Sequence, residues 1–205
     1  MEVPVKLAGE GILDLAVLRR LARDIGLTPG DEYDLRGAGG VDRKLPKYNA
    51  AAKHWPWIVV RDLDSDPCAG ALARSLLPLP AEWMRLRIAV KSIESWVLAD
   101  PESLSEKFGV RIAAIPGAPD ELPNPKLKML QLMASSRNRD IRESMLRARP
   151  GVKLEPGPQY NVRLSQFVEN QWDRQSALGS SPSLTRAWNR LEEFAARISA
   201  RWGRE

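Results

Sequence analysis

Four short runs of apolar and β-branched residues mark the first hundred residues of the chain. Trp57–Arg61 (WIVVR) is the strongest of them, and a nearly continuous apolar run of this kind is typical of a buried central strand. Between the runs, Leu15, Leu18 and Ala22 recur at spacings of three and four, which predicts one face of a helix. The pattern predicts strands at 3–8, 32–36, 57–61 and 86–90. Strands that alternate with helices predict an α/β fold with a mostly parallel sheet flanked by helices.

The strand pattern fades after residue 100, and helical periodicity replaces it. The clearest stripe runs through Leu184, Trp188 and Leu191, with Ser181 as a predicted N-cap and Pro182 at the first helical position. Helices are predicted at 101–108, 125–147, 159–170 and 182–202, with proline- and glycine-rich loops at 115–125 and 150–158. We therefore expect two parts, an α/β core over residues 1–100 and a helical extension over 101–205 that packs on it.

Composition narrows the chemistry that this chain can perform. The 205 residues are 43% hydrophobic and 28% charged, as expected for a globular protein that buries a core. A single cysteine and a single histidine exclude an internal disulfide, a thiolate metal cage and a histidine-rich metal site. Any metal must therefore be held by carboxylates, which favour Mg²⁺ or Mn²⁺. No apolar stretch resembles a signal peptide or a membrane span, so we expect a cytoplasmic protein without a membrane partner.

Three aspartates, Asp62, Asp64 and Asp66, follow the predicted central strand. Because side chains two residues apart in a strand share a face, Asp62 and Asp64 are expected to point the same way. Two carboxylates held so close repel each other unless a cation lies between them. Parallel α/β sheets also bind their ligands at the carboxyl ends of the strands. These residues therefore predict a divalent metal site, although Asp66 has the alternative role of capping the next helix.

Two glutamates are placed to join the same site. Glu10 lies between Gly9 and Gly11 at the end of the first strand, and Glu94 follows the fourth strand. Both are expected at the same edge of the sheet as Asp62, and both are predicted metal ligands. The structural alternative for each is a glutamate that is favoured near a helix N-terminus by the helix dipole.

The positive charge is concentrated in one segment. Residues 126–149 contain seven lysines and arginines but only two acidic residues, and the whole chain carries a net charge of +5. Such a segment predicts an anionic partner, most commonly nucleic acid. The candidate nucleic-acid-binding residues are Lys126, Arg137, Arg139 and Arg142. The alternative is a solvated helix face.

A glutamate after the first strand and an Asp-x-Asp after the third resemble the Toprim domain of topoisomerases, primases and overcoming-lysogenization-defect nucleases. Most of the chain also resembles a family of uncharacterised bacterial proteins with a Toprim-like core. The segments that carry this resemblance are Gly9–Gly11, WIVVRDLDSDPC (57–68), RIAVKSIESWVLADPE (87–102), PNPK (123–126), SSRNRDIRESM (135–145) and SSPSLTRAW (180–188).

The resemblance implies a Toprim-like (Rossmann-like) core and a function. Glu10, Asp62 and Asp64 would be the catalytic, metal-binding carboxylates, with Mg²⁺ or Mn²⁺ as cofactor. The implied activity is cleavage of nucleic-acid phosphodiesters, in bacterial defence against phage. Lys91 is then expected to stabilise the developing negative charge, as is the Lys126 ammonium group. Many Toprim nucleases act with an ATPase, so a partner ATPase is also implied.

Other functions remain open from the sequence alone. A haloacid-dehalogenase-type phosphatase would need an aspartate where this chain has Glu10. A nucleotide-sugar or phosphate-transfer enzyme could use the Asp-x-Asp to hold a metal, but this leaves Glu10 unexplained. A nucleic-acid- or partner-binding module without catalysis is the non-enzymatic alternative. The sequence also leaves open whether the protein forms a homodimer, and no GxxxxGK phosphate loop occurs.

Overall fold

A computed structural model describes residues 3–147 and 154–203. Its strands are β1 (Val5–Gly9), β2 (Pro29–Asp34), β3 (Trp57–Asp62), β4 (Met84–Ala89), β5 (Leu146–Arg147) and β6 (Glu155–Pro156). Its α-helices are α1 (Ile12–Asp24), α2 (Ala38–Ala51), α3 (Ala69–Leu76), α4 (Ile93–Leu98), α5 (Pro101–Phe108), α6 (Pro125–Ala134), α7 (Arg139–Met145), α8 (Tyr160–Asn170), α9 (Arg174–Ser180) and α10 (Pro182–Trp202). Two 3₁₀ turns occupy Ile112–Ala114 and Pro119–Glu121.

The main sheet has four strands in the order β2-β1-β3-β4, and every neighbouring pair is parallel. This confirms the predicted α/β fold. The second strand begins earlier than predicted, at Pro29. A proline is tolerated there because β2 is an edge strand, whose outer side needs no ladder hydrogen bonds. Since all four strands run the same way, their carboxyl ends meet at one edge of the sheet.

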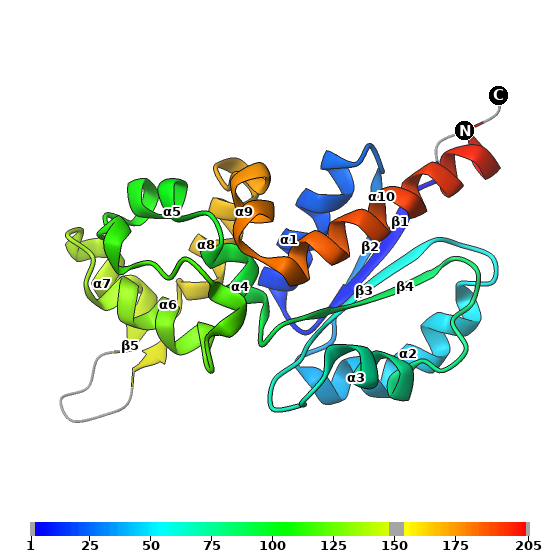
Figure 1. Cartoon of the computed structure of the whole chain (residues 1–205), viewed down its shortest axis with the longest axis horizontal. Helices are drawn as coiled ribbons and strands as arrows, with labels where there is room; N and C mark the ends of the chain where they lie inside the picture. Colours follow the sequence, from blue (N-terminus) through cyan, green and yellow to red (C-terminus); the bar gives the residue numbers. More distant parts are fainter. Residues whose placement is uncertain (1–2, 148–153, 204–205) are drawn as a thin grey trace.

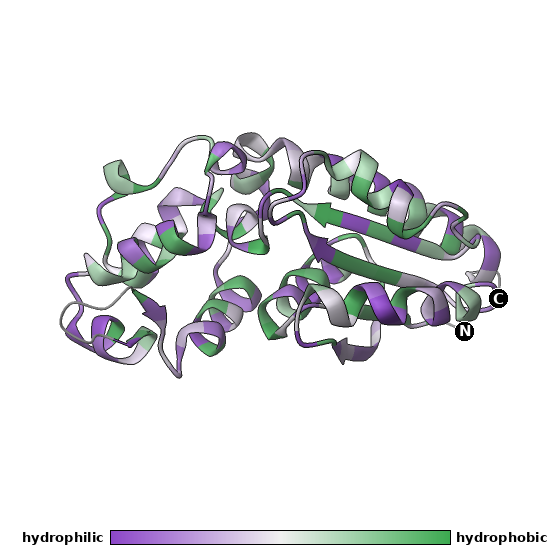
Figure 2. Ribbon diagram, turned by 90° about the horizontal axis from the view of Figure 1, so that it is seen from below, coloured by the Kyte–Doolittle hydropathy of each residue, from purple (hydrophilic) through white to green (hydrophobic). Residues whose placement is uncertain are grey.

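Helices cover both faces of the sheet, with α2 and α3 on one side and α1 and α10 on the other (Figure 1). Alternate residues of β3 divide between the two layers. Val59 packs with Val41 and Leu45 of α2, whereas Val60 belongs to the larger apolar cluster that includes α1. The hydrophobic stretches of the strands thus lie between the helix layers (Figure 2).

The helical extension forms the other end of an elongated molecule and shares a core with the sheet (Figure 1). Helix α8 packs along α1, and α10 returns to cover β4. One apolar cluster joins Leu18 of α1, Phe167 of α8 and Leu191 of α10. The extension therefore packs against the α/β core, and the N-terminal end of α6 lies near the carboxyl ends of the strands.

Some predicted boundaries were wrong. The single helix predicted at 125–147 is two helices, because the chain turns after Ala134 and Asn138 caps α7 by accepting a hydrogen bond from the Asp140 N–H. Helix α9 was not predicted. Arg149 and residues 150–153 of the predicted loop at 150–158 lie outside the described residues. No helix in the described ranges is long and apolar enough to span a membrane.

Candidate functional site

A cavity of about 740 Å³ lies where the carboxyl ends of the strands meet the helical extension. Its walls come from the segments that follow β1, β3 and β4, from the N-terminal ends of α1, α4 and α6, and from α8. The chemistry-bearing side chains that line it are Glu10, Asp14, Asp62, Asp64, Lys91, Glu94, Asn124 and Lys126. Residues separated by more than 100 positions in the sequence thus share one wall.

A hydrogen bond links the backbone of Asp62 to the side chain of Glu10. The backbone N–H of Asp62 donates to Glu10 Oε1 at 2.9 Å, and the N–H of Ile93 donates to Asp62 Oδ1 at 2.9 Å. Burial raises the pKa of Asp62 to about 10, with further contributions from the Asp14 and Glu94 carboxylates. Burial also raises the pKa of Glu10, although the Asp62 N–H opposes this shift. Without a cation, these carboxyl groups resist ionisation.

Asp14 is the site residue that sequence reasoning missed. It lies in the first turn of α1, its side chain is only 5% exposed, and its Oδ1 atom has no hydrogen-bond partner among the described residues. Burial raises the pKa of Asp14 to about 8, and the Glu94 and Glu10 carboxylates add to the shift. The available signal was a lone acid within the apolar run Ile12–Leu18. An unpaired carboxylate on a buried helix face is costly unless it serves a ligand.

Glu94 is held in place by neutral hydroxyl groups. Ser92 Oγ donates to Glu94 Oε2 at 2.7 Å, and the hydroxyl of Tyr160 on α8 donates to Glu94 Oε1 at 3.3 Å. The side chain of Glu94 is 5% exposed, and Lys126 Nζ lies 4.0 Å from its Oε1 atom. Burial raises the pKa of Tyr160 well above its ordinary value, and the adjacent Glu94 adds to this effect. Tyr160 therefore remains a donor that fixes the orientation of Glu94.

Asp64 lines the cavity in a different way from that expected. Strand β3 ends at Asp62, and Asp64 adopts a left-handed backbone conformation with φ of 51°. The strand alternation that was to align Asp62 with Asp64 therefore stops before Asp64. Its carboxylate accepts a 3.0 Å hydrogen bond from Arg61, which also lies 3.7 Å from Glu10 and contacts Asp42. Arg61 thus forms ion pairs with two of the carboxylates that line the cavity, those of Glu10 and Asp64.

Positive groups also line the cavity, and one of them lies beside Glu94. Lys91 follows β4, and Lys126 lies in the first turn of α6, where the Asn124 side chain accepts a hydrogen bond from the Leu127 N–H at 2.8 Å. The N-terminus of α6, with its partial positive charge, therefore faces the cavity. Carboxylates and cationic groups that line the same cavity suit a metal ion bound to an anionic substrate.

The remaining predicted residues lie outside the cavity wall. Asp66 is not among the lining residues, and Cys68, not Asp66, occupies the N-cap position of α3. Arg139 is exposed and pairs with Glu143 at 2.7 Å. Arg142 donates to the backbone oxygen of Ser136, and Arg137 is exposed. The structure thus separates the predicted carboxylate site from most of the predicted basic segment.

The carboxylate oxygens that line the cavity are suitable ligands for a hard divalent cation. Carboxylate oxygens are the ligands that Mg²⁺ and Mn²⁺ prefer, and Asp14 Oδ1 is an unpartnered buried donor atom. Within residues 3–147 and 154–203, however, no three His, Cys, Asp or Glu side chains already form a ligand cage. Binding therefore requires side-chain rotations that bring the carboxylates toward one ion.

We expect Gly9→Ala to damage this site, because Gly9 packs directly against Asp14. A Cβ atom at position 9 would lie 2.5 Å from the Asp14 Cβ, so α1 or β1 must shift. Overpacking of this kind typically costs about 1–3 kcal/mol. Gly117→Ala is the control, because nothing lies within 4 Å of a Cβ at that position. Equal melting temperatures for the two variants would contradict the close contact between β1 and Asp14.

No protein-family model matches the chain, and neither the curated proteins nor the solved structures include a significant match.

Proposed function

We propose that this protein is a metal-dependent enzyme that cleaves nucleic-acid phosphodiesters with Mg²⁺ or Mn²⁺ held by the cavity carboxylates. The observation that carries this proposal is the gathering of Glu10, Asp14, Asp62 and Glu94 around one cavity at the carboxyl ends of parallel strands. Each of the three strand-following residues was a candidate from the sequence, and Asp14 completes the set. Carboxylates at this edge of an α/β sheet are well placed to hold a ligand.

The residues that line the cavity have different roles in the proposed reaction. Asp62, with Asp14, Glu10 and Glu94, would hold the cation, which supplies Lewis acidity and an activated water when bound. Arg61 keeps Glu10 and Asp64 oriented through its ion pairs. Lys91 and Lys126, with the α6 N-terminus, would bind the scissile phosphate and compensate its charge.

The four-stranded parallel sheet and the order of the acidic residues support a Toprim-like enzyme. The same arrangement is also compatible with the alternative, a metal-dependent enzyme that acts on a nucleotide sugar. Both enzymes would bind a phosphate group beside a metal ion held by carboxylates. Involvement of Glu10 and Asp14 favours the nuclease, since these residues have no assigned task in an Asp-x-Asp sugar-nucleotide site. A partner ATPase and a role in anti-phage defence remain part of the proposal.

The direct test is a cleavage assay with purified full-length protein. Supercoiled plasmid, single-stranded DNA and single-stranded RNA are incubated with 5 mM Mg²⁺, Mn²⁺ or EDTA, on the order of the concentrations that such weak hydrated-ion sites require. We expect shortened products with a divalent ion and none with EDTA. Hydrolysis of a nucleotide sugar without any cleavage of nucleic acid would replace the nuclease with the alternative enzyme.

The basic segment gives a separate prediction for substrate binding. If Arg137, Arg139 and Arg142 contact phosphates, replacing all three with alanine weakens binding to every nucleic-acid sequence. The slope of log affinity against log salt should flatten by about 0.7–0.9 for each lost contact. Arg186→Ala, at an exposed position on α10, is the control. An unchanged slope in the triple variant would assign these arginines to solvent and to the ion pair with Glu143.

A further inference from the structure

A second cavity, of about 540 Å³, lies along edge strand β4 and shares no lining residue with the carboxylate cavity. Its walls come from α3, the loop that follows it, β4 and α10. The charged side chains that line it are Arg74, Arg85, Arg87, Arg190, Arg197, Glu82 and Glu193. Arginine therefore outnumbers acid by five side chains to two, in a hollow between a sheet edge and two helices.

Only some of these arginines have carboxylate partners. Arg190 pairs with Glu193 at 2.8 Å, and Arg197 pairs with Glu82 at 3.3 Å. Arg74, Arg85 and Arg87 have no carboxylate within ion-pair distance among residues 3–147 and 154–203. The three therefore present uncompensated positive charge to the same cavity.

Arg87 is the most informative of the three. Its Nε atom is buried and has no hydrogen-bond partner in the described part of the chain. A buried guanidinium N–H that lacks an acceptor costs folding free energy, so its retention needs another explanation. Burial lowers the pKa of Arg87, and the nearby Arg190 contributes to the shift. An anion in the cavity would supply both the missing acceptor and the missing negative charge.

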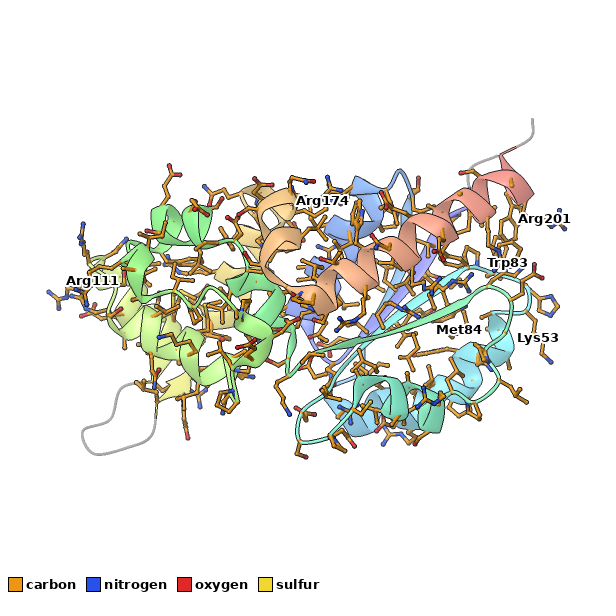
Figure 3. All side chains as sticks on the ribbon, in the orientation of Figure 1. Lys53, Trp83, Met84, Arg111, Arg174 and Arg201 are labelled. Carbon is orange, nitrogen blue, oxygen red and sulfur yellow. The ribbon has the colours of Figure 1, made fainter. Side chains whose placement is uncertain are left out.

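Arg85 is pre-positioned on the same face of β4 as Arg87, two residues away. Its guanidinium lies over the Phe194 ring at 4.2 Å and donates to the backbone oxygen of Met84 at 2.7 Å. Burial lowers the pKa of Arg85 to about 10, and Arg197 and Arg87 act in the same direction. Trp83, beneath the C-terminal part of α10 in Figure 3, lies 5.4 Å from the Arg197 guanidinium and supports this wall. The Arg85 guanidinium is thus held in place by packing before any ligand binds.

We propose that this cavity is a binding site for a ligand with two or more adjacent phosphate groups. Guanidinium groups match phosphate oxygens in geometry and form charge-assisted hydrogen bonds with them. Three uncompensated arginines fit several negative charges better than one. A diphosphate and the backbone of a nucleic acid both offer this chemistry, and the experiment separates them. The proposal does not depend on catalysis at the carboxylate cavity.

The test uses the full chain in EDTA, so that the carboxylate site remains without metal. Binding of pyrophosphate is measured by isothermal titration calorimetry, and binding of a labelled 12-nucleotide single strand by fluorescence anisotropy. The variants are the double change Arg85→Gln with Arg87→Gln, and the single change Arg74→Gln. Arg74 is exposed on α3, so its variant keeps the test valid where the double variant fails to fold. Arg186→Gln, exposed on α10 and outside the cavity, is the matched control.

We expect the Arg74 variant to weaken binding about tenfold, which is the loss of roughly one charge-assisted contact, and the double variant to weaken it further. Arg186→Gln should bind like the wild type. Binding of pyrophosphate identifies a soluble phosphorylated ligand, whereas binding of the oligonucleotide alone identifies a nucleic-acid backbone, and either result supports the site. Failure of both probes to bind, or equal binding by the Arg74 and Arg186 variants, would overturn the proposal.

Discussion

Asp62→Asn is expected to abolish cleavage, lowering the rate by about a hundredfold or more, while leaving the fold intact. Asparagine keeps an oxygen to accept the hydrogen bond from the Ile93 N–H, but it removes the negative charge at the centre of the carboxylate cluster. A metal ion lowers the activation free energy of such a reaction by several kcal/mol, and each 1.36 kcal/mol is about a tenfold change in rate. In EDTA at pH 8 the variant should melt above the wild type, because folding no longer requires the Asp62 carboxyl group to take up a proton.

Asp31→Asn is the matched control for this prediction. Asp31 lies on β2 with an exposed side chain that pairs with Lys6, so its loss affects only a surface ion pair. Its variant should keep both the cleavage rate and the melting temperature close to those of the wild type. If Asp62→Asn retains full activity, Asp62 is not a metal ligand for the reaction. If it melts lower in EDTA, the Asp62 carboxylate stabilises the fold.

Stability without metal should fall as the pH rises from 5.5 to 8. The folded-state pKa of Asp14 is raised to about 8 and that of Asp62 to about 10, well above the ordinary carboxyl value near 4. The folded protein therefore binds more protons than the unfolded chain over this range, which makes the free energy of unfolding decrease with pH. Each such carboxyl group lowers the free energy of unfolding by up to about 1.4 kcal/mol for each pH unit. Each kcal/mol lost lowers the melting temperature by about 2–4 °C.

Differential scanning calorimetry in EDTA measures this dependence directly. Asp14→Asn should flatten the decrease, because one of the carboxyl groups with a raised pKa is gone, whereas Asp31→Asn should leave the slope unchanged. Added Mn²⁺ should raise the melting temperature more at pH 8 than at pH 5.5, since the cation competes with protons for the same oxygens. A melting temperature that rises with pH in EDTA would mean that these carboxylates are already stabilised by neighbouring groups.

The α/β fold could be predicted because each strand has a local signal in the sequence. The run at residues 57–61 is apolar enough to be buried on both faces, and α10 begins at Ser181 and Pro182 with a continuous apolar stripe behind it. Helix ends were harder to predict where capping competes with periodicity. The region 125–147 keeps a helical composition throughout, but Asn138 begins a new helix there.

The candidate site could be predicted only in part, because the sequence indicates which residues follow strands but not which helix faces oppose them. Glu10, Asp62 and Glu94 were predicted from their places at strand ends, and the structure brings them to one cavity. Asp14 could not be assigned, since its role depends on the packing of α1 against Gly9 and on the Glu94 and Glu10 carboxylates near it. The position of Asp64 was also not predictable, because the left-handed turn after β3 is set by pairing of Asp64 N–H with the Lys91 carbonyl.

A crystal of the full-length protein soaked in Mn²⁺ tests the central claim most directly, because anomalous scattering locates the ion and identifies its ligands. We predict one or two peaks in the carboxylate cavity, with oxygens of Asp62 and at least one of Glu10, Asp14 and Glu94 at about 2.0–2.6 Å from the ion. The same soak of the Asp62→Asn protein should give no peak there. A wild-type crystal with manganese elsewhere on the surface and an empty carboxylate cavity would contradict the account.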